Sequence, residues 1–242
     1  MPVPATPSEC PNQILARLPL VEYRRLAPYL ERLDTPLKFG FFERNRPIDF
    51  VYFPLSGEHS VLAVMDDGAT VEVGAVGNEG FSTVEVLTGS ENALEKVVCE
   101  IPGESLRLPV EKFKDAVQGD TALRRLANRY LQAYLGQVSQ AVACNRLHTT
   151  EERFAKWMLM NHDRVPGDDI HITQEFLADM LGVHRPSVTM IARSFERLGL
   201  IRYRRGCVTI LDRAGIEEMA CECYDVVCKQ FERALGKLDP PR

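Results

Sequence analysis

The stretch Ile172-Thr-Gln-Glu-Phe-Leu-Ala-Asp-Met-Leu-Gly-Val-His-Arg-Pro-Ser-Val-Thr189 decides the fold of this chain. Thr173 suits a helix N-cap, and apolar residues recur at helical spacing after it until Gly182. Pro186 is tolerated in the first turn of a second helix, because the first amides of a helix have no intrahelical partner. The pattern therefore predicts two short, consecutive helices.

The second of these helices is expected to present a polar face to solvent. Its apolar positions recur at helical spacing and must face a core: Val188, Ile191, Phe195 and Leu198. Arg185, Thr189 and Arg193 then align on the opposite face. Arg can bind guanine O6 and N7 with two hydrogen bonds, Thr can contact a base edge or a thymine methyl, and a helix N-terminus favours phosphate. The pair predicts a helix-turn-helix that reads the DNA major groove, and an ordinary surface helix is the alternative.

A basic hairpin is predicted directly after the second helix. Residues 200–211 form two strand patterns around Arg205-Gly206, and Arg202, Arg204 and Arg205 could lie along DNA phosphates. Such contacts give affinity but little specificity. His184–Gly206 contains six Arg and one acidic residue, and a chance cluster of solvated arginines is the alternative interpretation of this charge.

Charge divides the chain into two parts. The whole chain has 242 residues and a net charge of −5. The first 120 residues carry 11 basic and 19 acidic side chains, whereas the remainder carries 18 basic and 15 acidic ones. An acidic module joined to one with a concentrated basic patch fits a sensor fused to a DNA reader.

Short apolar runs separated by turn signals begin at Leu37, and they predict an all-β roll or barrel. Asp67-Gly68 between two alternating runs indicates a hairpin. We therefore expect an α+β chain in three segments: a β-roll sensor domain at 1–118, a dimerisation helix at 119–147, and a winged helix-turn-helix with a C-terminal helix at 148–242.

The long helix, predicted from Thr121 to about Arg146, has two apolar stripes. The expected seam of a homodimer is the stripe with coiled-coil spacing: Leu123, Ala127, Tyr130, Tyr134, Gln137 and Ala141. The second stripe is Leu131, Leu135, Val138 and Val142. One stripe can contact the β module while the other meets a partner helix. A single helix buried by its own chain is the alternative. Gln137 on the seam would cost stability but could fix register.

The opening stretch, followed by Leu198-Gly-Leu-Ile201, resembles the DNA-binding domain of the cyclic-AMP receptor/fumarate-nitrate (Crp/Fnr) regulator family. The resemblance covers nearly the whole chain. It implies a cyclic-nucleotide-binding-like β-roll (jelly roll), a long dimerisation helix and a winged helix, in that order. It also implies a homodimer that binds double-stranded DNA at a palindromic operator, with RNA polymerase as a further candidate partner.

The resemblance extends to single residues of the reading helix. Arg185 matches the family's guanine-reading Arg, and Ser187 matches a Ser or Thr that contacts the backbone. Pro186 and Met190 stand where many members carry a base-reading Glu and a second Arg, so the usual half-site sequence is not implied. The predicted DNA-binding residues are Thr173, Gln174, Arg185, Ser187, Thr189, Met190, Arg193, Arg202, Arg204 and Arg205.

The sensor departs from the members that bind cyclic nucleotides. Gly77-Asn-Glu-Gly80 only partly resembles their phosphate-binding turn, and the slot for their Arg-Ser pair falls near Ala93-Leu94-Glu95. A buried phosphate would lack its main partner without that Arg, so we expect no cyclic AMP. Cys10 is the only N-terminal Cys, which argues against an iron–sulfur cluster, and we expect no haem.

We also expect no metal site. His59 is the only histidine before His148, so the roll cannot form a cupin-type centre. Cys221 and Cys223, if they lie on a helix, point to nearly opposite faces, whereas Cys221 and Cys228 share one. We interpret these residues as packing thiols, and a metal or redox site is the alternative.

The remaining features exclude several classes of protein. No catalytic triad, paired-carboxylate site or phosphate-cradling glycine loop is present in the sequence, so we expect that the protein is not an enzyme.

The alternative to a DNA-binding regulator is a small-molecule or protein-binding signalling module without DNA readout. The seven cysteines have no framework spacing, and the chain lacks a secretory signal and an apolar run of roughly 18 residues. We therefore expect a cytoplasmic protein with no membrane partner.

Overall fold

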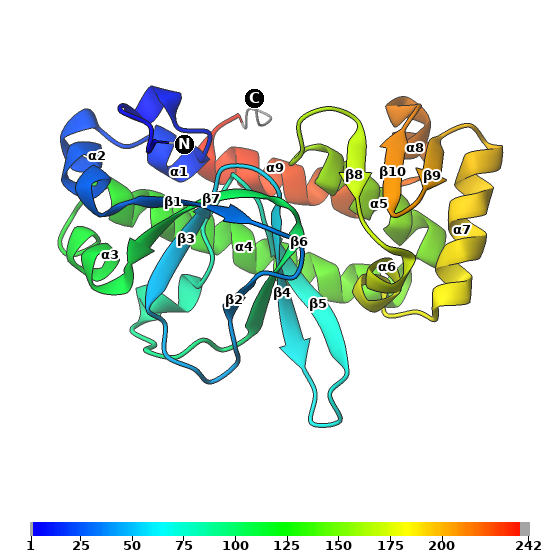
Figure 1. Ribbon diagram of the computed structural model, residues 1–242, viewed down its shortest axis with the longest axis horizontal. Coiled ribbons are helices and arrows are strands. Elements are labelled where there is room, and N and C mark those ends of the chain that lie inside the picture. The colour runs from blue at the N-terminus through cyan, green and yellow to red at the C-terminus, as the bar shows by residue number, and fades with distance from the viewer. Residues whose placement is uncertain (1, 238–242) are drawn as a thin grey trace.

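Short antiparallel strands form two sheets in the first half of the chain, as the computed structural model shows for residues 2–237 (Figure 1). Met1 and the last five residues of the predicted segment 148–242 lie outside the described residues. One sheet has the order β1 (Glu31–Thr35), β7 (Gly103–Pro109), β3 (Phe50–Pro54). The other has the order β2 (Gly40–Phe42), β6 (Lys96–Ile101), β4 (Glu58–Val64), β5 (Thr70–Val76). The predicted β-roll is confirmed.

The sequence pattern predicted the hairpin of the second sheet but not the first strand of the other sheet. The predicted hairpin joins β4 to β5, and Gly68 has a φ of +87° in its loop. Strand β1 was not predicted, because Glu31-Arg-Leu-Asp-Thr35 has one apolar residue. It is held instead by pairing with β7, where the side chains of Arg107 and Glu31 lie 2.6 Å apart.

Short helices surround the roll. They are α1 (Gln13–Ala16), α2 (Leu20–Leu26) and α3 (Val110–Ala116), with single turns η1 (Pro7–Glu9), η2 (Ala27–Tyr29) and η3 (Val84–Thr88). Asn12 caps α1, because its Oδ1 accepts hydrogen bonds from the amides of Ile14 and Leu15. Among the described residues, none of the helices combines the length and apolar character that a membrane crossing requires.

The long helix α4 (Ala122–Leu147) begins after the N-cap Thr121, close to its predicted bounds. The residues expected to form a dimer seam lie against the chain itself. Tyr130 and Tyr134 contact Gly80 and Gly74, where an added Cβ would lie 2.0 and 2.8 Å from the tyrosine side chains. Leu123, Ala127 and Gln137 are buried as well, and Ala141 is half-buried. The close approach at the two glycines explains this difference.

The second stripe of α4 remains accessible. Leu135 is 56% exposed and Val142 is 69% exposed, while Leu131 and Val138 in the same stripe are half-buried. A further helix, α9 (Cys223–Leu235), lies alongside α4 on another face (Figure 1). Its Val227 and Phe231 join the core of the roll, so α9 contacts the N-terminal segment and not only the segment in which the sequence grouped it.

The last part of the chain has a second core. Helix α5 (Thr150–His162) begins with a capping box: the Glu152 amide donates to Thr149 Oγ1, and the Glu152 carboxylate accepts from the Thr149 amide. The other elements are α6 (Gln174–Leu181), α7 (Arg185–Arg197), α8 (Arg213–Met219) and a sheet of order β8 (Asp169–His171), β10 (Cys207–Ile210), β9 (Ile201–Arg204). The winged helix-turn-helix is therefore confirmed.

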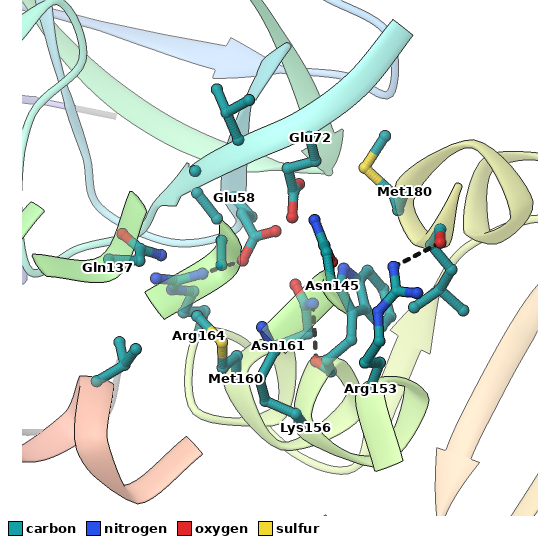
Figure 2. Close-up of a pocket in the computed structure, with 17 residues that line it drawn as sticks. Glu58, Glu72, Gln137, Asn145, Arg153, Lys156, Met160, Asn161, Arg164 and Met180 are labelled. Atoms are coloured by element: carbon teal, nitrogen blue, oxygen red, sulfur yellow. Dashed lines mark hydrogen bonds and ion pairs between the residues drawn. The ribbon is translucent and has the colours of Figure 1, made fainter. Parts of the chain in front are cut away.

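A buried ion-pair group joins the two halves. Arg164, just after α5, donates to the carboxylate of Glu58 on β4 and, over 2.6 Å, to that of Glu79 in the turn after β5. The three side chains are at most 7% exposed. Figure 2 shows Arg164 directed at Glu58 beside a cavity of about 50 Å³ that residues from both halves line.

Replacing Arg164 is expected to destabilise the protein. Arg164→Met leaves two buried carboxylates uncompensated, which should lower the free energy of unfolding by about 3–5 kcal/mol. Urea unfolding monitored by the single Trp157 measures this change. Arg24→Met, at an exposed position of α2, is the matched control. An equal effect of the two substitutions would contradict the role of Arg164.

Stability should also depend on pH through Glu100. Burial raises the pKa of Glu100 well above 4.5, and the neighbouring Glu72 and Glu58 raise it further. The native state therefore favours the protonated carboxyl, so the stabilisation is complete below pH 4.5 and is lost as the pH rises. Glu100→Gln should be more stable than the parent chain at pH about 8 and similar to it below pH about 4.5, by urea unfolding. Glu91→Gln, which is exposed, should show no such difference.

Candidate nucleic-acid interface

Helix α6 is positioned by a cap at each end. Thr173 Oγ1 accepts a hydrogen bond of 3.2 Å from the Phe176 amide, and Gly182 ends the helix with a φ of +62°. This left-handed conformation suits glycine, and it turns the chain at once into α7. Leu177 and Ala178 on the inner face of α6 enter the second core.

Helix α7 has the two faces that its sequence predicts. Val188, Ile191 and Phe195 are at most 5% exposed, whereas Arg185 and Arg193 are exposed. No side chain caps the start of α7 at His184, so this helix N-terminus is open to an anion. The exposed face of α7 therefore offers two guanidinium groups, one of them in the first turn of the helix.

Thr189 is less available than its place on this face suggests. Its Oγ1 donates to Gln174 Oε1 over 2.8 Å and also lies 3.2 Å from the Arg185 carbonyl oxygen. The single hydroxyl proton is therefore used inside the protein, while the methyl group remains available for apolar contact. The same bond orients the amide of Gln174, whose NH2 group can still donate. The sequence pattern included both residues but could not reveal their contact.

The wing is formed and attached to both helices. Strands β9 and β10 are joined at Arg205 and Gly206, whose φ values of +50° and +77° fit a type I′ hairpin. The Tyr203 hydroxyl donates to the Ile172 carbonyl over 2.8 Å, and the Tyr203 amide donates to the Glu196 carboxylate over 2.8 Å. Glu196, the one acidic residue of the basic stretch, thus holds the wing against α7.

The predicted DNA-binding residues come from three neighbouring elements on the side of α6, α7 and the wing (Figure 1). Seven are exposed: Thr173, Arg185, Met190, Arg193, Arg202, Arg204 and Arg205. Gln174, Ser187 and Thr189 are half-buried. Met190 is the most exposed apolar side chain of α7, at 72%. This position therefore presents an uncharged thioether to solvent, in place of the second Arg that many family members carry. Sequence reasoning missed Tyr203 and Glu196, whose roles depend on contacts across the fold.

The turn that partly resembles a nucleotide-binding motif is occupied by the chain's own side chains. The Glu79 carboxylate accepts hydrogen bonds from the Gly77 amide, at 3.0 Å, and from Arg164. These hydrogen bonds occupy the Glu79 carboxylate, which would otherwise be available to bind a ligand. His59 in the roll is equally engaged, because its ring nitrogens lie 2.7 Å from Ser82 Oγ and 3.0 Å from Ser105 Oγ.

Among the described residues, the structure brings together two groups of potential metal ligands that the sequence analysis did not expect, an acidic one (Glu58, Glu72 and Glu100) and one that contains thiols. Cys144, His148, Cys221 and Cys223 present their ligand atoms within 4.8 Å of one another. The prediction failed to combine them because it placed Cys221 and Cys223 on one helix. Cys221 in fact precedes α9, in the turn after α8, so the two thiols can face the same point.

Residues 152–219, which run from α5 to the end of α8, match the Crp-like helix-turn-helix domain. The chain contains a Crp-like DNA-binding domain within the fold of the Crp/Fnr regulators. A CRP-family transcriptional regulator of Thermus thermophilus is similar to 87% of this chain over 99% of its own length, at 18% identity and a TM-score of 0.64. FixK2 of Bradyrhizobium japonicum is similar to 79% of this chain over 98% of its own, at 12% identity and a TM-score of 0.66.

Other similarities agree with this assignment. A CRP/FNR-family transcriptional regulator, also from Thermus thermophilus, is similar to 78% of the chain over 98% of its own length, at 23% identity and a TM-score of 0.55. A search of curated protein sequences finds no match. The Crp/Fnr resemblance predicted from the sequence is therefore confirmed at the level of the fold and of the helix-turn-helix.

Proposed function

We propose that this chain is a homodimeric transcription regulator that reads a two-fold-symmetric DNA site through α7 and its wing. The exposed face of α7 carries the proposal, because Arg185 in its first turn and Arg193 further along are both exposed on the second helix of a Crp-like helix-turn-helix. Two such helices would enter successive major grooves about 34 Å apart. Arg202, Arg204 and Arg205 on the wing would contact phosphates. The location would be cytoplasmic, where such DNA lies, and the seven free thiols support this.

DNA selection tests this function. The purified chain is incubated with a random duplex library, and the bound fragments are sequenced and measured at several salt concentrations. We expect an enriched palindrome whose affinity falls steeply with salt, because phosphate contacts release counterions. Specific ligand or protein binding with no enriched DNA would instead favour a signalling module that lacks DNA readout.

Arg185 is the proposed base reader. Arg185→Ala should weaken binding to the selected site by about 1–3 kcal/mol and relax the base preference at one position of each half-site. Binding assays on the selected site and its single-base variants measure both effects. Arg24→Ala removes an exposed charge far from the interface and is the matched control. If Arg185→Ala selects the same sequences with the same preference, Arg185 does not read a base.

The outer stripe of α4 is the proposed dimer seam, in place of the stripe that the sequence analysis chose. Leu135 and Val142 lie seven residues apart, which is the repeat of a coiled coil, and both are exposed in the protomer. Tyr134, in contrast, is 8% exposed and fills the space above Gly74. A partner helix along Leu131, Leu135, Val138 and Val142 would bury this apolar surface.

Leu135→Glu should therefore shift the protein from dimer to monomer, because it places a charge in the apolar seam. Sedimentation velocity over a range of concentrations measures the change. Leu94→Glu is the control, because Leu94 is 59% exposed, close to the 56% of Leu135, and lies on the roll. A dimer of unchanged stability in Leu135→Glu would place the seam elsewhere.

A further inference from the structure

Three thiols and one imidazole meet where the end of α4 contacts the segment between α8 and α9. Cys144 lies in the last turn of α4 and His148 is its C-cap residue. Cys221 lies in the turn after α8, and Cys223 is the first residue of α9. The three sulfur atoms and one ring nitrogen lie within 4.8 Å of one another. Four ligands of this kind are the usual set for zinc.

The spacing of the ligand atoms fits a tetrahedral ion. The Sγ atoms of Cys144 and Cys221 are 3.6 Å apart, and Cys223 Sγ lies 3.5 Å from His148 Nδ1. Bonds of about 2.3 Å to sulfur and about 2.0 Å to nitrogen give tetrahedral edges of roughly 3.8 Å between two sulfurs and roughly 3.5 Å between sulfur and nitrogen. The side chains therefore already stand close to the positions that a zinc ion requires.

A second layer of polar groups supports the same assignment. His148 Nε2 lies 3.1 Å from the Glu222 carboxylate, so the ring can donate there and leave Nδ1 free for a metal. Metal-ligating histidines commonly donate their other ring nitrogen to a carboxylate in this way. Gln140 Nε2 donates to Cys223 Sγ over 3.1 Å, as expected beside a thiolate.

Packing alone does not account for these thiols. The three buried cysteines form a cluster of their own, separate from the apolar cores of the roll and the winged helix. Buried cysteines that serve as small apolar side chains would instead be surrounded by such a core. Cys228, which the sequence placed on the face of Cys221, is not in the cluster.

We propose that Cys144, Cys221, Cys223 and Nδ1 of His148 bind one Zn²⁺ ion. Each thiol gives up its proton to solvent on binding, and no electron is transferred. Four protein ligands close the coordination sphere, which is typical of a structural site. The ion connects the end of α4 to the start of α9, so it holds the C-terminal helix and the winged helix against the long helix. This proposal is independent of the proposed DNA binding.

Metal analysis of the full chain tests the site. Protein reconstituted with zinc under reducing conditions and then desalted should hold about one zinc ion per chain. Cys221→Ser and Cys223→Ser should each lose most of it, and Co²⁺ in place of zinc should show the intense visible bands of a tetrahedral thiolate site. Cys207→Ser and Cys228→Ser keep all four ligands and are the matched controls.

If substitution of a zinc ligand prevents folding, a variant of a residue next to the ligands still tests the proposal. Glu222→Gln should weaken zinc affinity about 10–100-fold in competition with a chromophoric chelator, while Glu218→Gln on α8 should leave it unchanged. Folded protein that takes up no zinc overturns the proposal. Equal zinc in Cys221→Ser overturns it too.

Discussion

The buried guanidinium of Arg164 determines how the two halves of this protein sit together. Arg164 follows α5 in the winged-helix half, yet both of its carboxylate partners, Glu58 and Glu79, belong to the roll. Removing three charged groups from water is costly, and mutual attraction offsets that cost only while the geometry is maintained. A displacement of one half against the other that breaks these ion pairs is therefore opposed, because it leaves the buried charges without compensation.

The long helix depends on a different constraint, the close approach of aromatic rings to glycine. Tyr130 and Tyr134 occupy space that side chains at Gly80 and Gly74 would fill, so one face of α4 is committed to the roll. Helix α9 covers a neighbouring face. What remains is a narrow apolar stripe, and its residues have no counterpart within the described part of the protomer that would bury them fully. One helix can thus contact the sensor, the C-terminal helix and a second copy on separate faces.

The candidate DNA-reading surface is held together by hydrogen bonds between its own polar groups. Gln174 and Thr189 connect α6 to α7, and Tyr203 connects the wing to both the start of α6 and the end of α7. These bonds reduce the number of donors and acceptors that are free for bases. They also hold α6, α7 and the wing to one another, so the backbone that carries Arg185 and Arg193 is supported from both sides.

The sequence by itself determined the local features of this protein. The cap at Thr173, the Asp67-Gly68 hairpin and the apolar period of α7 depend on neighbouring residues, so the sequence pattern was enough to predict these elements and the family resemblance. It also identified which side of α7 is exposed, because only one face can enter a core.

Only the tertiary structure decided which distant residues meet. Both stripes of α4 are apolar, and which of them faces the roll depended on glycines that lie 50 and 60 positions away in the chain. Strand β1 is mostly polar and is held by its partner β7, which no local pattern contains. Cys144 and Cys221 are 77 positions apart, and a break between two helices brings their sulfur atoms together. Contacts of this kind arise from the path of the backbone, and a local pattern does not encode that path.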